Sequence, residues 1–297
     1  MIRIAASLVC GMLISSVVMA DVAHVSKGLD IYYQKSGQGD IPVVLVPGWM
    51  MSSEVFERQL KFFSSSKDFT IYAIDPRSQG RSSKTSDGNF YEQHGQDIGD
   101  FVATLGLKNV VLAGWSNGGF DILSYVHQFK TTQLAGLVMI DAAPQGSGQD
   151  NTKDWVWFNK DDSDGYRQYF TQQALLHRDD LNNEFAKWMV ENPTPEYMSW
   201  IKKISSQTSD EVAAILNESS AYQDYSGTLK ALEGKVSLLY FASADKYPIV
   251  KRWAGNNTPS AQVIEFPKHL SFWERDAEFN KALSQFLNQI KTSVNHI

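Results

Sequence analysis

Short apolar runs alternate with amphipathic helical patterns along most of this chain, and that alternation limits the possible folds more than any other feature. Six runs have the length of strands buried on both faces: IPVVLVPG, FTIYAIDPR, NVVLAGWS, LAGLVMIDAAP, KVSLLYFAS and AQVIEFP. Between two of them, residues 98–105 carry apolar side chains at positions i, i+3, i+4 and i+7. Strands that alternate with helices predict an α/β protein with a doubly wound, mostly parallel sheet.

One long segment interrupts this alternation. From residue 145 to residue 230 no buried-strand run appears, and aromatic residues are frequent. We therefore expect a helical lid at 145–230, inserted into a core formed by 21–144 and 231–297. The pattern leaves open whether the aromatic side chains form the core of the lid or line a pocket. They include Trp155, Trp157, Phe158, Tyr166, Tyr169, Phe170, Trp188, Tyr197 and Trp200.

The chain begins with MIRIAASLVCGMLISSVVMADVAHV, which has the pattern of a secretory signal peptide. A positive residue, Arg3, precedes an apolar run, and small residues end it near Ala20. The alternative is a membrane anchor, but the apolar run of about fifteen residues is shorter than the ~20 that a span needs. We expect residues 1–20 to be removed and the mature chain to be periplasmic or secreted, without stable membrane insertion.

Charge and cysteine content narrow the possible chemistry. The single cysteine, Cys10, lies inside the expected signal peptide, so the mature chain would have no disulfide, no thiolate metal site and no cysteine nucleophile. The net charge is −6 and no basic run is present, which argues against nucleic acid or an anionic membrane as a partner. No histidine or carboxylate cluster has metal-ligand spacing, so we expect neither a metal nor another cofactor. The oligomeric state has no signature in the sequence.

The segment GWSNGG places Ser116 between a predicted strand and a predicted helix. It fits the pattern G-x-S-x-G, in which the serine lies on a sharp turn with its hydroxyl exposed at the edge of the sheet. Such a turn brings neighbouring backbone close, so the residues two before and two after the serine must have almost no side chain. Gly114 and Gly118 meet this requirement. The context therefore predicts that Ser116 is a nucleophile.

A serine hydroxyl needs a general base, and His269 is the best candidate among the six histidines. It lies between the last predicted strand and the last predicted helix, where loops from the carboxyl ends of strands converge. Two of the others precede Ser116, against the order serine, acid, histidine of this architecture. The remaining three lie far along the helix after Ser116, in the predicted lid, or at the end of the chain.

Two aspartates compete for the third position, the acid that orients the histidine. Asp245 follows the strand KVSLLYF, and Asp141 ends the strand LAGLVMI. We favour Asp245, because the strand before it lies between Ser116 and His269 in the sequence, as the usual order of this architecture requires. We expect Asp141 to cap the turn towards Pro144. Sequence order permits either residue.

Two backbone N–H groups are expected to hold the oxyanion that forms when an ester carbonyl is attacked. Asn117 follows the nucleophile at a helix N-terminus and supplies the first. The loop Pro47-Gly48-Trp49 after VVLV supplies the second from Trp49, with Gly48 permitting a close approach. Pro47 has no N–H, so it cannot be a donor.

Together these motifs resemble the α/β-hydrolase superfamily from about Val25 to Leu287, and within it the lidded branch of non-haem chloroperoxidase-like enzymes, arylesterases and perhydrolases. VVLVPGWMM is similar to the oxyanion loop of that family, IDPRSQGRSS to its Asp-x-Arg loop, and HLSFWERD to its histidine loop. The departures are Pro47 in place of histidine, Ser78 in place of glycine, Asn117 in place of methionine, and Asp276 in place of proline. The resemblance implies a triad of Ser116, Asp245 and His269, with structural roles for Asp75 and Arg77.

The expected activity is hydrolysis of a small or aryl carboxylic ester through an acyl-enzyme, with a small-molecule ester or lactone as substrate. A lactonase or a perhydrolase/chloroperoxidase-like enzyme with the same triad is the alternative within the enzyme class. The alternative from another class is a non-catalytic ligand-binding protein with a hydrolase fold. Turnover of any small ester distinguishes the two classes.

Overall fold

The computed structural model describes residues 18–163 and 165–294. Most of the predicted signal peptide, residues 1–17, lies outside the described residues. Its last residues lie inside them: Met19 and Ala20 are in the first strand and pair with Lys35 and Gln34. None of the helices in the described ranges has the length and apolar character needed to cross a bilayer.

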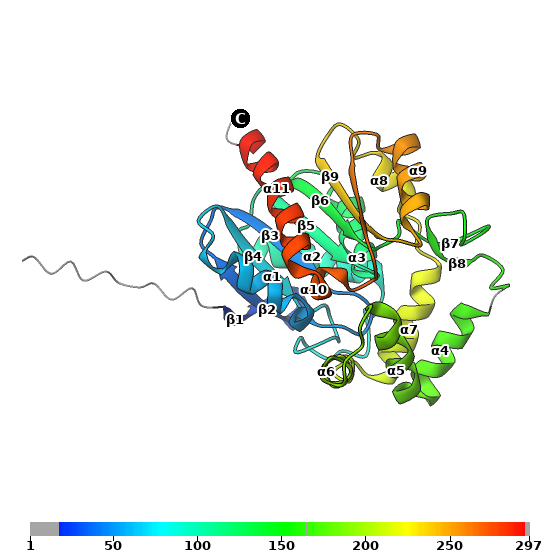
Figure 1. The fold of residues 1–297 in the computed structure, drawn as a ribbon. Helices are drawn as coiled ribbons and strands as arrows, with labels where there is room; N and C mark the ends of the chain where they lie inside the picture. Colours follow the sequence, from blue (N-terminus) through cyan, green and yellow to red (C-terminus); the bar gives the residue numbers. More distant parts are fainter. Residues whose placement is uncertain (1–17, 164, 295–297) are drawn as a thin grey trace, which may run out of the picture.

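A twisted eight-stranded sheet forms the centre of the molecule, with strand order β1-β2-β4-β3-β5-β6-β9-β10 (Figure 1). β1 and β2 form an antiparallel hairpin, β2 is antiparallel to β4, and the other neighbours are parallel. Each of the six apolar runs contains one of the strands from β3 onwards, which confirms the predicted mostly parallel sheet. The strands are β1 (Met19–His24), β2 (Asp30–Gly37), β3 (Ile41–Val46), β4 (Phe69–Ile74), β5 (Val110–Trp115), β6 (Leu134–Ile140), β9 (Ser237–Ser243) and β10 (Gln262–Phe266).

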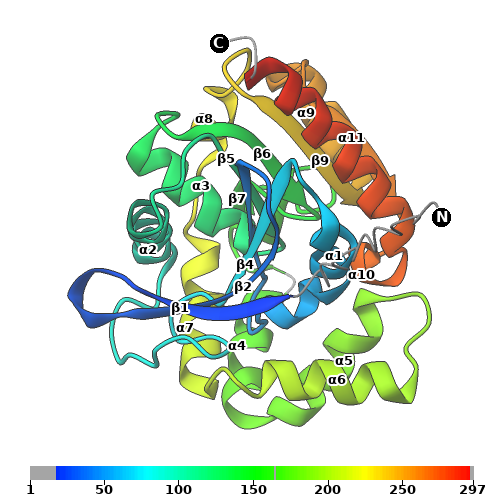
Figure 2. The same cartoon turned by 90° about the vertical axis from the view of Figure 1, so that its left-hand side faces the viewer.

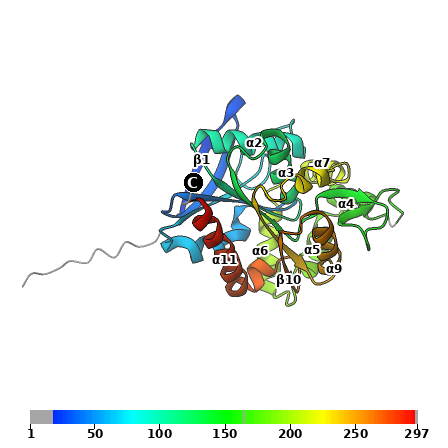
Figure 3. The same cartoon turned by 90° about the horizontal axis from the view of Figure 1, so that it is seen from above.

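Helices cover both faces of the sheet, which explains why β3, β4 and β5 are buried along their whole length (Figure 2). α2 (Tyr91–Thr104) and α3 (Gly118–Phe129) lie on one face, and α1 (Glu57–Phe62) and α11 (Asp276–Val294) on the other, as the view from above also shows (Figure 3). Alternate strand residues serve the two sides, because side chains of a strand point to opposite faces. Leu112 packs with the α2 and α3 side, and Val111 with the α11 side.

Shorter helices complete the core. The α-helices are α8 (Ser226–Lys230), α9 (Tyr247–Asn257) and α10 (Ser271–Glu274). The 3₁₀-helices are η1 (Ser26–Gly28), η2 (Ser53–Phe56) and η3 (Phe63–Ser65).

The segment between β6 and β9 contains the predicted lid, 145–230. Its longer helices are α4 (Tyr166–Leu176), α5 (Arg178–Met189), α6 (Pro195–Ser205) and α7 (Asp210–Ala221), which lie together beside one end of the sheet (Figure 1). The short helix α8 also lies within this segment. The segment is not helical throughout: β7 (Gln145–Gly148) and β8 (Val156–Asn159) pair in parallel at its beginning. β7 consists of the small and polar residues QGSG, which the search for apolar runs does not detect. The domain boundaries stay a prediction.

Two buried polar groups hold the loops near the carboxyl ends of β3 and β4. The Asp75 carboxylate accepts hydrogen bonds from the backbone N–H of Ser53 and of Arg81, both at 2.6 Å. The Arg77 guanidinium donates two hydrogen bonds to the carboxylate of Asp97, at 2.7 and 2.8 Å. Both side chains therefore brace the backbone around the site, as the family resemblance implies.

Candidate active site

Ser116 lies on the sharp turn between β5 and α3. Its backbone φ is +54°, a left-handed conformation that a serine adopts only when the surrounding structure imposes it. A Cβ added at Gly114 would lie 2.3 Å from the carbonyl oxygen of Gly118, and one added at Gly118 would lie 2.5 Å from that of Val46. The two glycines are therefore required by close backbone approach, for the reason that the sequence suggested.

His269 and Asp141 form a buried hydrogen-bonded pair next to this turn. His269 Nδ1 and Asp141 Oδ2 are 2.6 Å apart, and the two residues are only 2% and 7% exposed. The Trp115 indole N–H donates to the His269 carbonyl oxygen at 2.9 Å, which fixes the histidine loop against the end of β5. The other ring nitrogen, His269 Nε2, is buried and has no hydrogen-bond partner among the described residues.

The structure corrects the choice of acid: Asp141 faces His269, and Asp245 does not. Asp245 lies exposed in the turn between β9 and α9. The reason is strand order, because β6 lies directly beside β5 and β9 lies one strand further away. The Ser116 backbone N–H donates to the Ile140 carbonyl oxygen at 3.0 Å, so the residue after Ile140 is brought beside Ser116. The expectation that Asp141 only caps a turn is also wrong.

β9 contributes a different residue to the site, Ser243. Its backbone N–H and its hydroxyl both donate to Asp141 Oδ1, at 2.7 and 2.8 Å. One carboxylate oxygen of Asp141 is thus held by β9 while the other meets His269, which fixes the direction of the carboxylate. Ser243 is not among the residues predicted from the sequence; its signal there is a polar residue at the last position of an apolar strand.

The loop after β3 passes close to Ser116. A Cβ at Gly48 would lie 2.8 Å from Ser116 Cβ, so only glycine permits this approach. The next two residues are Trp49 and Met50, and the Met50 backbone N–H donates to Gln79 Oε1 at 2.7 Å. Among the described residues, no protein acceptor takes a hydrogen bond from the backbone N–H of Trp49 or of Asn117. Both groups are therefore available to a ligand.

Comparison with known proteins identifies the fold. The family model described as "alpha/beta hydrolase fold" matches residues 41–188. An esterase from Exiguobacterium antarcticum superimposes with a TM-score of 0.79 at 20% identity, covering 91% of this chain and 100% of that one. A bromoperoxidase from Bacillus anthracis superimposes with a TM-score of 0.77 at 21% identity, covering 91% and 100% of the two chains.

The chain is an α/β-hydrolase-fold protein. A curated relative, the bifunctional esterase/perhydrolase of Acinetobacter calcoaceticus, is 34% identical over 118 residues, which are 39% of this chain and 42% of the relative. A non-heme haloperoxidase from Rhodococcus erythropolis is 34% identical over 119 residues, or 40% and 43% of the two chains. The chain thus matches about two fifths of the length of these curated relatives. They belong to the group that the sequence motifs resemble.

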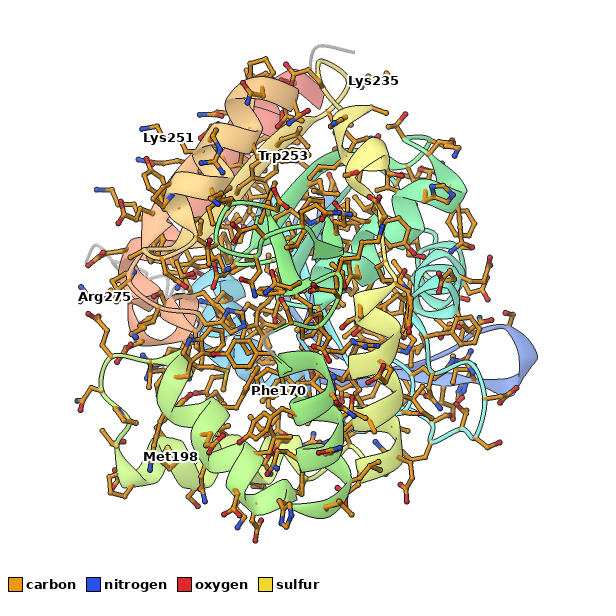
Figure 4. The ribbon with its side chains drawn as sticks, turned by 90° about the vertical axis from the view of Figure 1, so that its right-hand side faces the viewer. Phe170, Met198, Lys235, Lys251, Trp253 and Arg275 are labelled. Atoms are coloured by element: carbon orange, nitrogen blue, oxygen red, sulfur yellow. The ribbon has the colours of Figure 1, made fainter. Side chains whose placement is uncertain are left out.

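Aromatic rings of the lid cover His269. The ring centroid of Trp188 in α5 lies 4.6 Å from that of His269, and the ring centroid of Trp157 in β8 lies 6.0 Å from it. Phe185 contacts both Trp188, at 5.4 Å, and Trp49, at 5.7 Å. A further aromatic residue of the lid, Phe170 of α4, lies where the lid helices meet the core (Figure 4). Ser116 is only 8% exposed beneath this cover.

The end of α5 is attached to the histidine loop by backbone hydrogen bonds. The Leu270 N–H donates to the Met189 carbonyl oxygen at 2.8 Å. The Glu274 carboxylate accepts hydrogen bonds from the backbone N–H of Glu191 and of Asn192, both at 2.8 Å. The lid and the loop that carries His269 therefore share one attachment.

A second buried histidine–aspartate pair lies behind the oxyanion loop. His94 Nδ1 of α2 is 3.0 Å from Asp121 Oδ1 of α3. Burial raises the pKa of the Asp121 carboxyl, while the facing imidazole lowers it. His94 is therefore paired with a different acid from His269, in agreement with its exclusion as the base by sequence order.

Proposed function

We propose that this α/β hydrolase cleaves a small or aryl carboxylic ester through an acyl-enzyme on Ser116. The observation that carries the proposal is the 2.6 Å contact between Asp141 and His269 beside the strained serine turn. The Asp141 carboxylate accepts a hydrogen bond from the Nδ1–H of His269, which keeps the proton on Nδ1 and leaves the lone pair on Nε2. That nitrogen has no hydrogen-bond partner among the described residues, so its lone pair is free to take the proton of the Ser116 hydroxyl when a substrate binds.

The reaction then has two steps. Ser116 Oγ attacks the ester carbonyl carbon while its proton moves to His269 Nε2, and the negative oxygen is held by the backbone N–H groups of Trp49 and Asn117. His269 returns the proton to the alcohol oxygen as the carbon–oxygen bond breaks, which leaves an acyl group on Ser116. Water repeats the sequence and releases the acid.

The aromatic cover favours a compact and apolar substrate. Three aromatic rings of the lid lie over His269 or beside the rings that cover it: Trp157, Phe185 and Trp188. The substituents next to the ester carbonyl carbon therefore contact aromatic rings rather than water. A short acyl chain or an aryl alcohol fits beneath such a cover with less displacement of the lid than a long chain. One relative is named as an esterase/perhydrolase, and one structural neighbour as an enol-lactonase. Peroxide and lactones are therefore the alternative substrates to test beside esters.

A panel of p-nitrophenyl esters tests the substrate class, because the leaving group stays constant while the acyl chain grows. We expect the largest kcat/KM at two to four carbons and a fall of about tenfold or more beyond ten carbons. Lactones and peroxide-dependent turnover are measured beside it, with Ser116→Ala as the blank. A rate that rises steadily with chain length contradicts the compact site, and the absence of any turnover favours the non-catalytic alternative.

The proposal extends to export of the chain. It rests on the signal-peptide pattern of residues 1–20. We expect intact mass of the protein purified from a fractionated bacterial host to correspond to a chain that begins near Asp21, in the periplasm or the medium. Replacing Arg3 and the apolar run with a polar sequence should retain the protein in the cytoplasm. An uncleaved chain in the membrane fraction contradicts the expectation.

A further inference from the structure

Both proposed oxyanion donors are tied by their side chains to the same lid helix, α7. The Trp49 indole N–H donates to the Ala213 carbonyl oxygen at 2.8 Å. Asn117 reaches α7 through Tyr91: Asn117 Nδ2 donates to the Tyr91 hydroxyl at 3.0 Å, and that hydroxyl donates to the Leu216 carbonyl oxygen at 3.3 Å. Ala213 and Leu216 are three residues apart, so the two acceptors lie about one helical turn from each other.

These hydrogen bonds are in the interior, where an unpaired donor is costly. Trp49 is 6% exposed and Tyr91 is 2% exposed, and both surround a small interior space together with Asn117 and Leu216. Burial raises the pKa of the Tyr91 hydroxyl well above its ordinary value, so the group keeps its proton and remains a donor. The bonds are satisfied only while α7 keeps this position against the core.

α7 also connects the core to the outer part of the lid. At one end, the Ser147 hydroxyl of β7 donates to the Ala221 carbonyl oxygen at 2.8 Å. On its outer side, Asn217 Nδ2 donates to the Arg167 carbonyl oxygen of α4 at 2.9 Å, and the Arg167 guanidinium lies 3.0 Å from the Glu218 carboxylate. The position of α7 therefore depends on how the lid is packed.

We infer that α7 positions the oxyanion hole, with Trp49 and Tyr91 as the positioning residues that transmit its location to the backbone N–H groups of residues 49 and 117. The inference rests on the proposed function. Its physical basis is that oxyanion stabilisation is steep in geometry: a misplacement of about 1 Å costs on the order of a hundredfold in rate. Lid packing thus sets the rate of the chemical step, in addition to covering the site.

Tyr91→Phe tests the inference, because it removes one hydroxyl and keeps the ring. We expect kcat for p-nitrophenyl acetate to fall by about 10- to 100-fold while KM stays within about twofold, since the loss concerns the transition state. Trp49→Phe removes the indole N–H and should give the same pattern. Thermal unfolding followed by circular dichroism shows for each variant whether the fold is kept, and the two variants provide independent tests.

Phenylboronic acid gives a measurement that does not depend on the natural ester. Its boron atom forms a bond to Ser116 Oγ as the hydroxyl proton moves to His269, which produces a tetrahedral anion that resembles the oxyanion. We expect its Kd to rise in Tyr91→Phe by the same factor by which kcat falls. If the wild-type protein binds phenylboronic acid but hydrolyses no ester, only the proposed reaction is contradicted. The boronate Kd values of wild type and Tyr91→Phe then still test the role of α7. Absence of wild-type boronate binding counts against both.

Tyr197→Phe is the matched control. The buried Tyr197 hydroxyl donates to the Ala186 carbonyl oxygen at 3.1 Å, and both residues belong to the lid, outside the hydrogen bonds that join Trp49, Tyr91 and Asn117 to α7. We expect its kcat and boronate Kd to stay within about twofold of wild type. If both contacts act through α7, the double variant Trp49→Phe/Tyr91→Phe loses less than the product of the two single effects. A Tyr91→Phe variant that behaves like Tyr197→Phe, or a double variant with the full product, overturns the inference.

Discussion

Ser116→Ala is expected to lower kcat for ester hydrolysis by about a millionfold, the scale seen when the nucleophile of a serine triad is removed. The reason is that the acyl intermediate forms on the Ser116 hydroxyl, which alanine lacks. The oxyanion donors and the aromatic cover stay in place in the variant. The measurement is steady-state turnover of p-nitrophenyl acetate at high enzyme concentration, with mass spectrometry to detect the acyl group on the wild-type protein.

The fold should survive this change, because Ser116 adopts its left-handed φ through the backbone around it and not through its hydroxyl. Circular dichroism and the thermal midpoint of the variant should therefore match wild type. A folded Ser116→Ala protein that keeps near-wild-type turnover rules out Ser116 as the nucleophile.

Asp141→Asn is expected to lower kcat by about ten-thousandfold, the cost of the wrong histidine tautomer in the serine-protease triad. An asparagine amide facing His269 Nδ1 donates a hydrogen bond to it, so the ring proton moves to Nε2 and the nitrogen beside Ser116 is no longer a base. Steady-state kinetics over a range of pH measures the loss, with thermal unfolding to separate it from misfolding.

Asp245→Asn is the matched control, since the same chemical change is made in an exposed turn. Its kcat and KM should stay close to wild type, because exposed substitutions away from special contacts usually have small effects. If Asp245→Asn is inactive and Asp141→Asn is active, the acid assigned from the structure is wrong.

The two aspartates show where sequence reasoning reaches its limit. The strands, the turn at Ser116 and the need for Gly114 and Gly118 follow from local patterns, because backbone geometry and side-chain size act over a few residues. The choice between Asp141 and Asp245 depends on which strand lies beside β5, and the order of strands in a sheet is a long-range property. Both residues follow an apolar strand, so their local patterns are nearly the same.

The lid contacts depend on even longer separations. The residues that reach the site from the lid, Trp188 above all, sit in an aromatic-rich segment whose helical phase the sequence does not fix. The hydrogen bond from Trp49 to Ala213 joins residues far apart in the chain. Such pairs are set by how whole helices pack, and a single sequence carries no pattern for them.

The attachment of α5 to the histidine loop has a consequence for building chimeric enzymes. One way to change the substrate preference of a lidded hydrolase is to replace the whole segment between β6 and β9 with that of a relative. Here the Met189 carbonyl and the backbone N–H groups of residues 191 and 192 find their partners in Leu270 and Glu274, outside that segment. The part of the chain that must be exchanged together is therefore discontinuous in sequence. A lid taken from a relative should keep its position over His269 only when the loop from Leu270 to Glu274 is exchanged as well.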